Sequence, residues 1–452
     1  MSIARSLPVL FLSLIFLSSC SLFRSASSGD SSPVRSSGES SGSGYSSVIT
    51  DDAVSSEGVL DVHYVGDDIF YEIPDSLLGR DFLMVSRVAK VPSNFFGFIS
   101  SGSKTAEQVF VFEKSRDMIN IRQRSYNSVA ADTLPIYRSV QANNYEPIIA
   151  SFDIEARGPD STSSVIQINE FFENDVPAIS GMVDFLRNIY SVRRLDSNRS
   201  YIDTVRTYPQ NVEARHVMTY EAMEPPSARG TNTISVLMNQ SMILLPKEPM
   251  RPRHADYRVG YFTVNQLDFS SDAQKADTRS LIRRWRLEPS DPEAYARGEL
   301  VEPVKPIVYY VDPGTPEEYR ENVITGVEDW NVAFEEAGFK NAIQAKLPPT
   351  EEEDPNFEPE DIRYNMVRWI ANTTRNATGP SVSDPRTGEI IASDIIWYHN
   401  HIRSYRNRLM LETGAANPDA RSLRIEEEYL GEAIRQVIAH EIGHAIGLPH
   451  NM

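Results

Sequence analysis

The sequence predicts an α+β protein in which a β-rich antiparallel amino-terminal region precedes a region of mixed helices and strands. Residues 57 to about 270 contain short runs of alternating apolar and polar residues, separated by turn-forming residues, as in antiparallel strands. After about residue 280, several apolar residues recur every three or four positions, which is the spacing of a helix face.

Composition and charge limit the possible functions. The chain has 452 residues, 40% of them hydrophobic, which is sufficient for two or three cores. Lys and Arg total 44 against 63 Asp and Glu, and the net charge of -19 would repel a phosphate backbone, so we expect no nucleic-acid partner. The single cysteine, Cys20, excludes intrachain disulfides and thiolate zinc sites. Any metal must therefore be held by His, Asp or Glu, and no pattern indicates the oligomeric state.

Residues 1–20 have the pattern of an export signal. Arg5 precedes an apolar run from Leu7 to Leu17, which is too short to cross a bilayer as an ordinary helix. The run ends in Leu17-Ser18-Ser19-Cys20, which resembles the bacterial lipobox. This resemblance implies a lipoprotein signal peptide and a diacylglycerol group on Cys20. The alternative is an incidental thiol behind an ordinary signal peptide.

Residues 21–56 are mostly Ser and Gly and are predicted to form a flexible tether. A tether that follows a lipid anchor places the protein in the bacterial cell envelope, attached to a membrane through its amino terminus. Ser21, in place of Asp, resembles lipoproteins that are sorted to the outer membrane. The face of that membrane is not indicated.

The β-rich region is divided into a small segment, 57–100, and a larger domain, 101–280. Turns are expected near Gly66, at 115–117 and at 158–161, and a helix is expected near 176–190. Residues 246–258 are rich in Pro and charge and are best interpreted as an exposed loop. A more speculative hypothesis places this segment across a cleft and assigns it control of access, through Arg251, Arg253, His254 and Asp256.

Residues 281–452 are predicted to form one further domain. A buried strand at 306–311 precedes a capping box at 315–318 and a long helix whose apolar face runs from Tyr319 to Ala337, before a stop at Gly338. The acidic run 351–361 is predicted to be a solvated loop, with a weak calcium site as the alternative because carboxylates are natural calcium ligands. The remaining elements are predicted strands at 362–371 and 389–399, a helix near 401–412 and a last helix that begins in the 420s.

The carboxyl-terminal HEIGHAIGLPH carries the clearest chemical signal. His440 and His444 are four residues apart, so on a helix both side chains project from one face and can bind one ion. Glu441 is rotated away and can act on a water molecule. Gly447 can end the helix and return His450 as a third ligand. Three imidazoles with one open position indicate Zn²⁺, with Glu441 as the catalytic base.

The same eleven residues are similar to the metzincin motif H-E-x-x-H-x-x-G-x-x-H. The resemblance implies a zinc-dependent endopeptidase that hydrolyses protein or peptide substrates. It also implies that residues 281–452 form the upper, amino-terminal subdomain of a metzincin-like protease. Residues 389–398 are then the candidate edge strand for substrate pairing, or an ordinary sheet strand. His399 and His401 are expected at the surface or at a helix entry.

More broadly, the chain resembles a bacterial family of lipoprotein zinc-dependent metalloproteases in which two domains of unknown function precede the catalytic domain. The segments FYEIPDSLLGRDFLMVSR and LLPKEPMRPRHADYRVGYF and the zinc motif carry this resemblance. Metzincins continue beyond the third histidine into a methionine turn and a lower subdomain. Because the printed sequence ends at Met452, we expect the catalytic domain to be truncated here.

Two other functions are compatible with the same residues. The zinc site could hydrolyse a non-peptide amide or ester, because the same activated water serves either reaction. The chain could also be a non-catalytic envelope lipoprotein that binds a glycan, peptide or protein partner through its β region.

Overall fold

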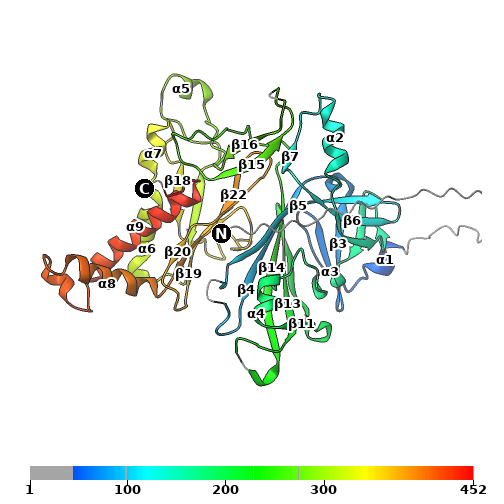
Figure 1. Ribbon diagram of the computed structural model, residues 1–452, viewed down its shortest axis with the longest axis horizontal. Helices are drawn as coiled ribbons and strands as arrows, with labels where there is room; N and C mark the ends of the chain where they lie inside the picture. The colour runs from blue at the N-terminus through cyan, green and yellow to red at the C-terminus, as the bar shows by residue number, and fades with distance from the viewer. Residues whose placement is uncertain (1–43, 97–98, 228, 273, 451–452) are drawn as a thin grey trace, which may run out of the picture. The chain divides into compact units, whose positions relative to one another are not determined.

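The computed structural model describes residues 44–96, 99–227, 229–272 and 274–450 (Figure 1). The predicted signal peptide, the lipidation site Cys20 and most of the predicted tether lie outside the described residues. The described residues belong to one unit that begins at Gly42. No helix among them combines the length and apolarity needed to cross a bilayer.

The predicted tether, 21–56, extends too far, because residues 44–56 fold onto the first sheet. This sheet has the order β1-β2-β3-β10-β9 and is antiparallel. The helix α1 (Tyr45–Val48) places the Tyr45 hydroxyl 2.8 Å from Glu72, to which it donates a hydrogen bond, and Ile49 packs in a small core with Phe70. These few apolar side chains pack against the sheet, although the Ser-rich composition of the segment predicts no core. The strands are β1 (Val54–Ser56), β2 (Asp61–Val65), β3 (Asp68–Pro74), β9 (Ala156–Arg157) and β10 (Ser163–Gln167).

An eight-stranded antiparallel sheet forms most of the β region. Its order is β11-β13-β14-β4-β5-β6-β8, with β12 paired to β13. Because β4 and β5 are neighbours, the predicted segments 57–100 and 101–280 contribute strands to the same sheet. The strands are β4 (Phe82–Lys90), β5 (Lys104–Ser115), β6 (Met118–Arg124), β8 (Ile148–Asp153), β11 (Val192–Leu195), β12 (Tyr201–Thr207), β13 (Asn211–Ala222) and β14 (Thr233–Leu244).

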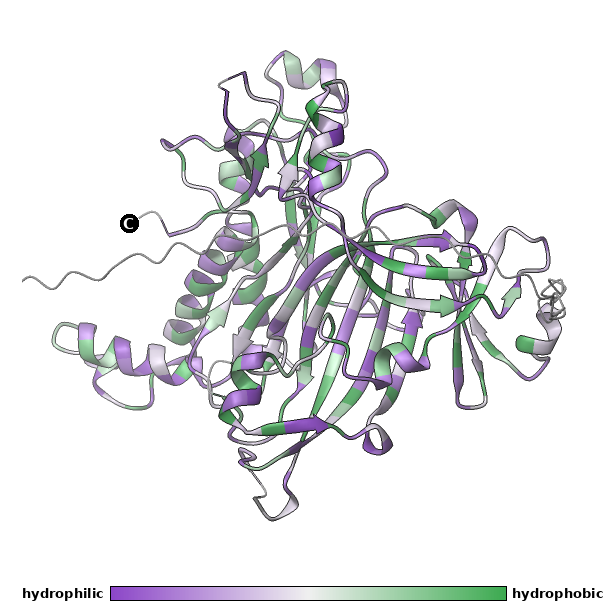
Figure 2. Cartoon of the chain, turned by 45° about the vertical axis from the view of Figure 1, so that its right-hand side comes forward, coloured by the Kyte–Doolittle hydropathy of each residue, from purple (hydrophilic) through white to green (hydrophobic). Residues whose placement is uncertain are grey.

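The predicted hairpin turns at 115–117 and 158–161 are confirmed by the β5–β6 and β9–β10 pairs. Figure 2 shows green and purple residues alternating along the long strands, as expected when one face of each strand is buried. The main core lies between the two sheets, where Phe82, Phe110 and Phe112 pack against Val62 and Ile73. The short helices here are α2 (Ile136–Asn143), α3 (Asn169–Glu173) and α4 (Asp184–Ile189), and α4 is shorter than the helix predicted near 176–190.

A small sheet joins the β region to the carboxyl-terminal region. It has the order β16-β15-β7, from β7 (Ser128–Val129), β15 (Thr263–Asp268) and β16 (Asp277–Ile282). The charged segment 246–258 runs beside β16, where the Ala255 N–H donates to the Ser280 carbonyl at 2.9 Å and His254 forms a bridge with Leu281.

The carboxyl-terminal region has a five-stranded sheet of order β18-β17-β19-β23-β20, in which only β20 is antiparallel. Helices α6 and α9 pack on this sheet through one apolar core (Figure 1). The strands, with the separate β21–β22 pair, are β17 (Ile307–Val311), β18 (Ile343–Lys346), β19 (Asn365–Ile370), β20 (Ala377–Thr378), β21 (Ser381–Ser383), β22 (Ile390–Ser393) and β23 (Ile395–Tyr398). The helices are α5 (Pro292–Ala296), α6 (Glu317–Glu328), α7 (Asn331–Glu336), α8 (His401–Thr413) and α9 (Glu427–Ala445).

Three details of this region differ from the predictions. The segment 389–398 divides into β22 and β23, and β23 lies inside the sheet between β19 and β20, so of the two predicted alternatives the ordinary sheet strand is confirmed and the edge strand is wrong. The expected long helix breaks after α6, where the Trp330 indole N–H donates to the Ala439 carbonyl of α9 at 2.7 Å. The capping box is absent, because the buried Thr315 hydroxyl has no hydrogen-bond partner among the described residues. The stop at Gly338 is confirmed by its φ of 90°.

The end of the acidic run is not a solvated loop. Asp361 is 1% exposed and pairs with Arg363 at 2.6 Å, while Glu360 pairs with Arg215 of β13. Glu360 thus bridges the large sheet and the carboxyl-terminal region, whereas Asp361 pairs within its own segment, where the ion pair stabilises a charge that would otherwise be costly to bury.

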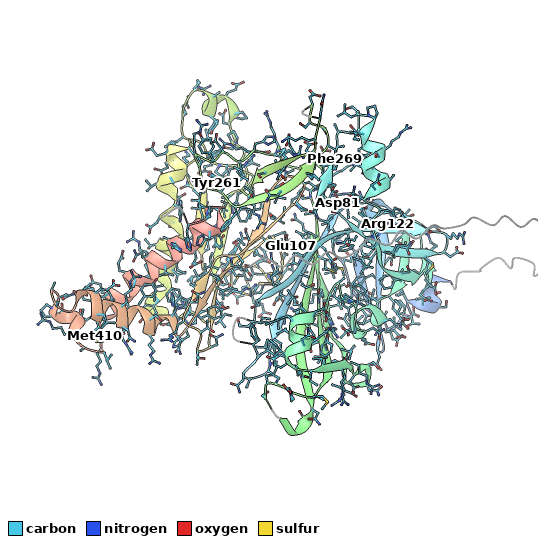
Figure 3. All side chains as sticks on the ribbon, viewed as in Figure 1. Asp81, Glu107, Arg122, Tyr261, Phe269 and Met410 are labelled. Atoms are coloured by element: carbon cyan, nitrogen blue, oxygen red, sulfur yellow. The ribbon has the colours of Figure 1, made fainter. Side chains whose placement is uncertain are left out.

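A second ionic junction joins the same two regions. Arg386 donates to Asp81 at 3.1 Å and to Asp384 at 2.7 Å, and the Tyr126 hydroxyl also donates to Asp81 at 2.7 Å. Figure 3 labels Asp81 near the start of β4.

Candidate metal centre

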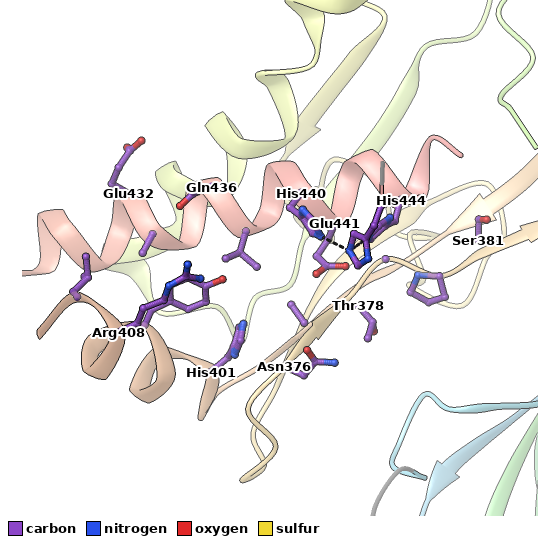
Figure 4. A pocket seen from close by; sticks show the side chains of 18 of the residues that line it. Asn376, Thr378, Ser381, His401, Arg408, Glu432, Gln436, His440, Glu441 and His444 are labelled. Carbon is purple, nitrogen blue, oxygen red and sulfur yellow. Dashed lines mark hydrogen bonds between the residues drawn. The ribbon is translucent and has the colours of Figure 1, made fainter. Parts of the chain in front are cut away.

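Helix α9 is held in place by one apolar face. Leu430, Ile434, Val437, Ile438 and Ile442 recur every three or four residues and are buried in the core with α6 and the five-stranded sheet. The face that this packing leaves free carries His440 and His444 (Figure 4). The predicted helix that begins in the 420s is therefore confirmed.

The structure brings together the three histidines that the motif singles out. The Nε2 atom of His450 lies 3.1 Å from Nε2 of His440 and 3.1 Å from Nε2 of His444. Two nitrogens that bind one tetrahedral Zn²⁺ at ~2.0–2.1 Å are separated by about 3.3 Å. The spacing of the imidazoles therefore fits zinc. Among the described residues, this cluster is also the one group of three or more His, Cys, Asp or Glu that converges as a metal site would require.

The turn after α9 places the third histidine. Gly447 has φ 109°, a conformation that L side chains rarely adopt, and its N–H donates to the His444 carbonyl at 3.0 Å. The chain then reverses, and Nδ1–H of His444 donates to the Leu448 carbonyl at 2.7 Å. This bond leaves Nε2 of His444 unprotonated and free to bind a metal.

Glu441 lies beside the histidines but is held differently. Its side chain is largely buried, and burial raises the pKa of its carboxyl above the ordinary value. The backbone N–H of Gly379 donates a hydrogen bond to this carboxylate. A Cβ on Gly379 would lie 2.2 Å from the Glu441 carbonyl oxygen, so only glycine allows this close approach. The sequence contained no signal for Gly379, because the contact joins positions 62 residues apart.

The pKa of His440 also suits metal binding. Burial lowers the pKa of His440, and the neighbouring His444 and His450 lower it further. Neutral imidazole is the form that binds a metal.

The centre opens into a cleft of about 1340 Å³. One wall is the free face of α9, the second is α8 with His401 and Tyr405, and the third is the segment 376–381 around β20 (Figure 4). Phe262 and Arg283, which flank β15 and β16, complete the wall near His444. Lys104 of β5 also reaches the cleft. None of these last three residues was predicted to contribute.

The other predicted residues lie apart from the metal cluster. His399 accepts a hydrogen bond from the Trp369 indole at 3.2 Å. His401 begins α8, as expected of a helix-entry residue, and lies between Trp397 and Tyr405. The hypothesis that 246–258 crosses the cleft is wrong, because its residues run beside β16 and do not line the cleft.

Three segments of the chain match known family models. Residues 42–91 match DUF5118 and residues 102–290 match DUF5117, both described as domains of unknown function. Residues 422–452 match DUF4953, which is described as Met-zincin. No curated protein and no solved structure gives a significant match. The segment that carries the three histidines and Glu441 is thus similar to a metzincin-like domain, which indicates a zinc metalloprotease-like protein.

Proposed function

We propose that this protein is a zinc-dependent endopeptidase in which His440, His444 and His450 hold the metal and Glu441 moves the proton. The observation that carries the proposal is the convergence of three imidazole Nε2 atoms beside a buried carboxylate, at the wall of an open cleft. The match of residues 422–452 to the Met-zincin model supports it.

Each side chain has a defined task. Zinc, when bound, supplies a Lewis acid that polarises the substrate carbonyl and acidifies a coordinated water. The Glu441 carboxylate accepts the proton of the attacking water and returns it to the nitrogen of the departing amine. The Gly379 N–H restrains the Glu441 carboxylate. Burial of Glu441 favours its protonated form, which is the form that can donate a proton to the departing amine.

The cleft favours a peptide over a small amide or ester. Sites for small molecules typically enclose ~300–1,000 Å³, whereas this cleft has about 1340 Å³. Strand β20 is at the edge of its sheet and the segment 376–381 lines the cleft, so an extended peptide can add to it through main-chain hydrogen bonds. The pairing role predicted for residues 389–398 therefore passes to 376–381.

The test combines metal analysis with peptide cleavage. Purified protein should contain one zinc and cleave unstructured peptides, and Glu441→Gln should keep the zinc while cleavage slows by ~10²–10⁴-fold. Glu428→Gln, an exposed substitution on the same helix, is the matched control and should cleave at the parent rate. Absence of bound zinc, or unchanged cleavage by Glu441→Gln, would refute the proposal.

A further inference from the structure

A strap formed by residues 261–285 connects the second domain of unknown function to the metal centre. Its two passages flank β15 and β16, and they are joined by a hydrogen bond from the Arg283 N–H to the Phe262 carbonyl at 2.7 Å. The whole strap falls within residues 102–290, outside the Met-zincin match.

The strap caps the carboxyl-terminal end of α9. The Phe262 N–H donates to the Gly447 carbonyl at 2.8 Å, and the Trp285 indole N–H donates to the Ala445 carbonyl at 3.1 Å. The Arg283 carbonyl occupies the space beside Gly447 where a side chain would begin. These contacts fix the strap against the turn that carries His450. Tyr261, whose ring lies 3.4 Å from the position that a Cβ on Gly447 would take, is labelled in Figure 3.

Arg283 is the cationic side chain of the cleft that lacks a partner. Three cationic side chains line the cleft in the described part of the chain, and two are neutralised, Lys104 by Glu107 and Arg408 by Glu412 at 3.0 Å. Arg283 forms no ion pair with a described residue, and its Nε is buried without an acceptor. An arginine that lines a cleft without a carboxylate partner can bind an anionic group of a ligand, because charge-assisted hydrogen bonds to a carboxylate would satisfy its guanidinium.

The neighbouring arginines have partners outside the cleft, although Nε of Arg284 is, like Nε of Arg283, buried without an acceptor among the described residues. Arg284 donates to the backbone carbonyls of Trp285 and Arg251, and Arg286 pairs with Glu389 at 2.6 Å. A role in capping α9 is not supported for Arg283, because the described hydrogen bonds to the end of that helix come from Phe262 and Trp285.

We propose that Arg283 recognises a carboxylate of the peptide substrate. A guanidinium presents paired N–H donors that match a carboxylate, and such charge-assisted bonds are stronger than hydrogen bonds between neutral groups. The proposal rests on the proposed peptidase function and defines its substrate as one with a carboxylate near the His444 end of the cleft. The carboxylate can belong to an Asp or Glu side chain or to the carboxyl terminus of the peptide.

Binding to the zinc-loaded Glu441→Gln protein tests this without consuming the peptide. The probes are fluorescent decapeptides: one neutral and amidated, one with a free carboxyl terminus, and an amidated series with a single glutamate at each position in turn. We expect one anionic form to bind about 10- to 100-fold more tightly than the neutral peptide. The form that does so identifies the source of the carboxylate.

Substitutions then assign the preference to Arg283. Added to this background, Arg283→Gln should abolish the preference without changing zinc content or affinity for the neutral peptide, and Arg283→Lys should retain part of it. Arg403→Gln, an exposed arginine of α8 outside the cleft, should leave the preference intact. Equal binding of all peptides, or a preference that survives Arg283→Gln, would overturn the inference.

Cleavage by the parent protein separates this inference from the proposed function. Cleavage with no charge preference in binding would leave the endopeptidase proposal standing and remove the role of Arg283. Charge-selective binding that depends on Arg283, without any cleavage, would support the recognition site and count against the peptidase.

Discussion

Replacing Gly447 by alanine should weaken zinc binding, because the glycine controls where His450 lies. At φ 109° an alanine is strained by ~1–3 kcal/mol. The added Cβ would also lie 2.2 Å from the Arg283 carbonyl oxygen, about 1 Å short of ordinary contact at 3.4 Å. The turn must therefore move by about 1 Å, whereas functional ligand geometry tolerates displacements of ~0.5 Å.

These terms predict at least about tenfold weaker zinc binding for Gly447→Ala, since ~1.4 kcal/mol corresponds to a factor of ten. Competition with a chromogenic chelator measures the affinity directly. Gly298→Ala is the matched control, because Gly298 also has positive φ, at 84°, but has no neighbouring atom within 4 Å of the added Cβ. The control should lose stability and keep its zinc affinity. Zinc binding by Gly447→Ala at parent affinity would refute this reasoning.

Three further predictions concern stability and attachment. Burial raises the pKa of the Glu213 carboxyl from 4.5 to about 7, so the native state binds this proton more tightly and stability should fall by up to about 3 kcal/mol between pH 4.5 and 7. Glu213→Gln should flatten this dependence in urea unfolding, and an unchanged slope would contradict it. Trp285→Phe leaves the Ala445 carbonyl without its donor and should lower the unfolding free energy by ~1–3 kcal/mol, as measured by calorimetry. A variant as stable as the parent would contradict this prediction. Cys20→Ser should abolish incorporation of labelled fatty acid in cells and release the protein from membranes, whereas continued labelling would exclude lipidation at this residue.

The motif was predictable because its geometry is local. His440 and His444 are separated by one helical turn, and Gly447 and His450 follow within six residues, so helix periodicity and one left-handed turn suffice to bring the ligands together. Alternation of apolar residues likewise predicted the antiparallel strands, because each strand buries one face.

Predictions failed where long-range packing decides the outcome. Residues 44–56 look like a linker by composition, yet a few apolar side chains attach them to the first sheet. The helix predicted across Trp330 is interrupted there, at the residue whose indole N–H donates to a carbonyl of α9. Nothing in the sequence of 389–398 indicates that β20 pairs with its outer edge.

By itself, the sequence determined the candidate metal ligands and the candidate base, since four side chains within eleven residues make up the motif. The tertiary structure alone decided the walls of the cleft. Gly379, Phe262 and Arg283 lie more than 60 residues from the motif and reach it only through sheet pairing and the capping of α9. Local spacing can set which atoms converge on an ion, but recognition of a substrate depends on surfaces that distant segments form when they pack.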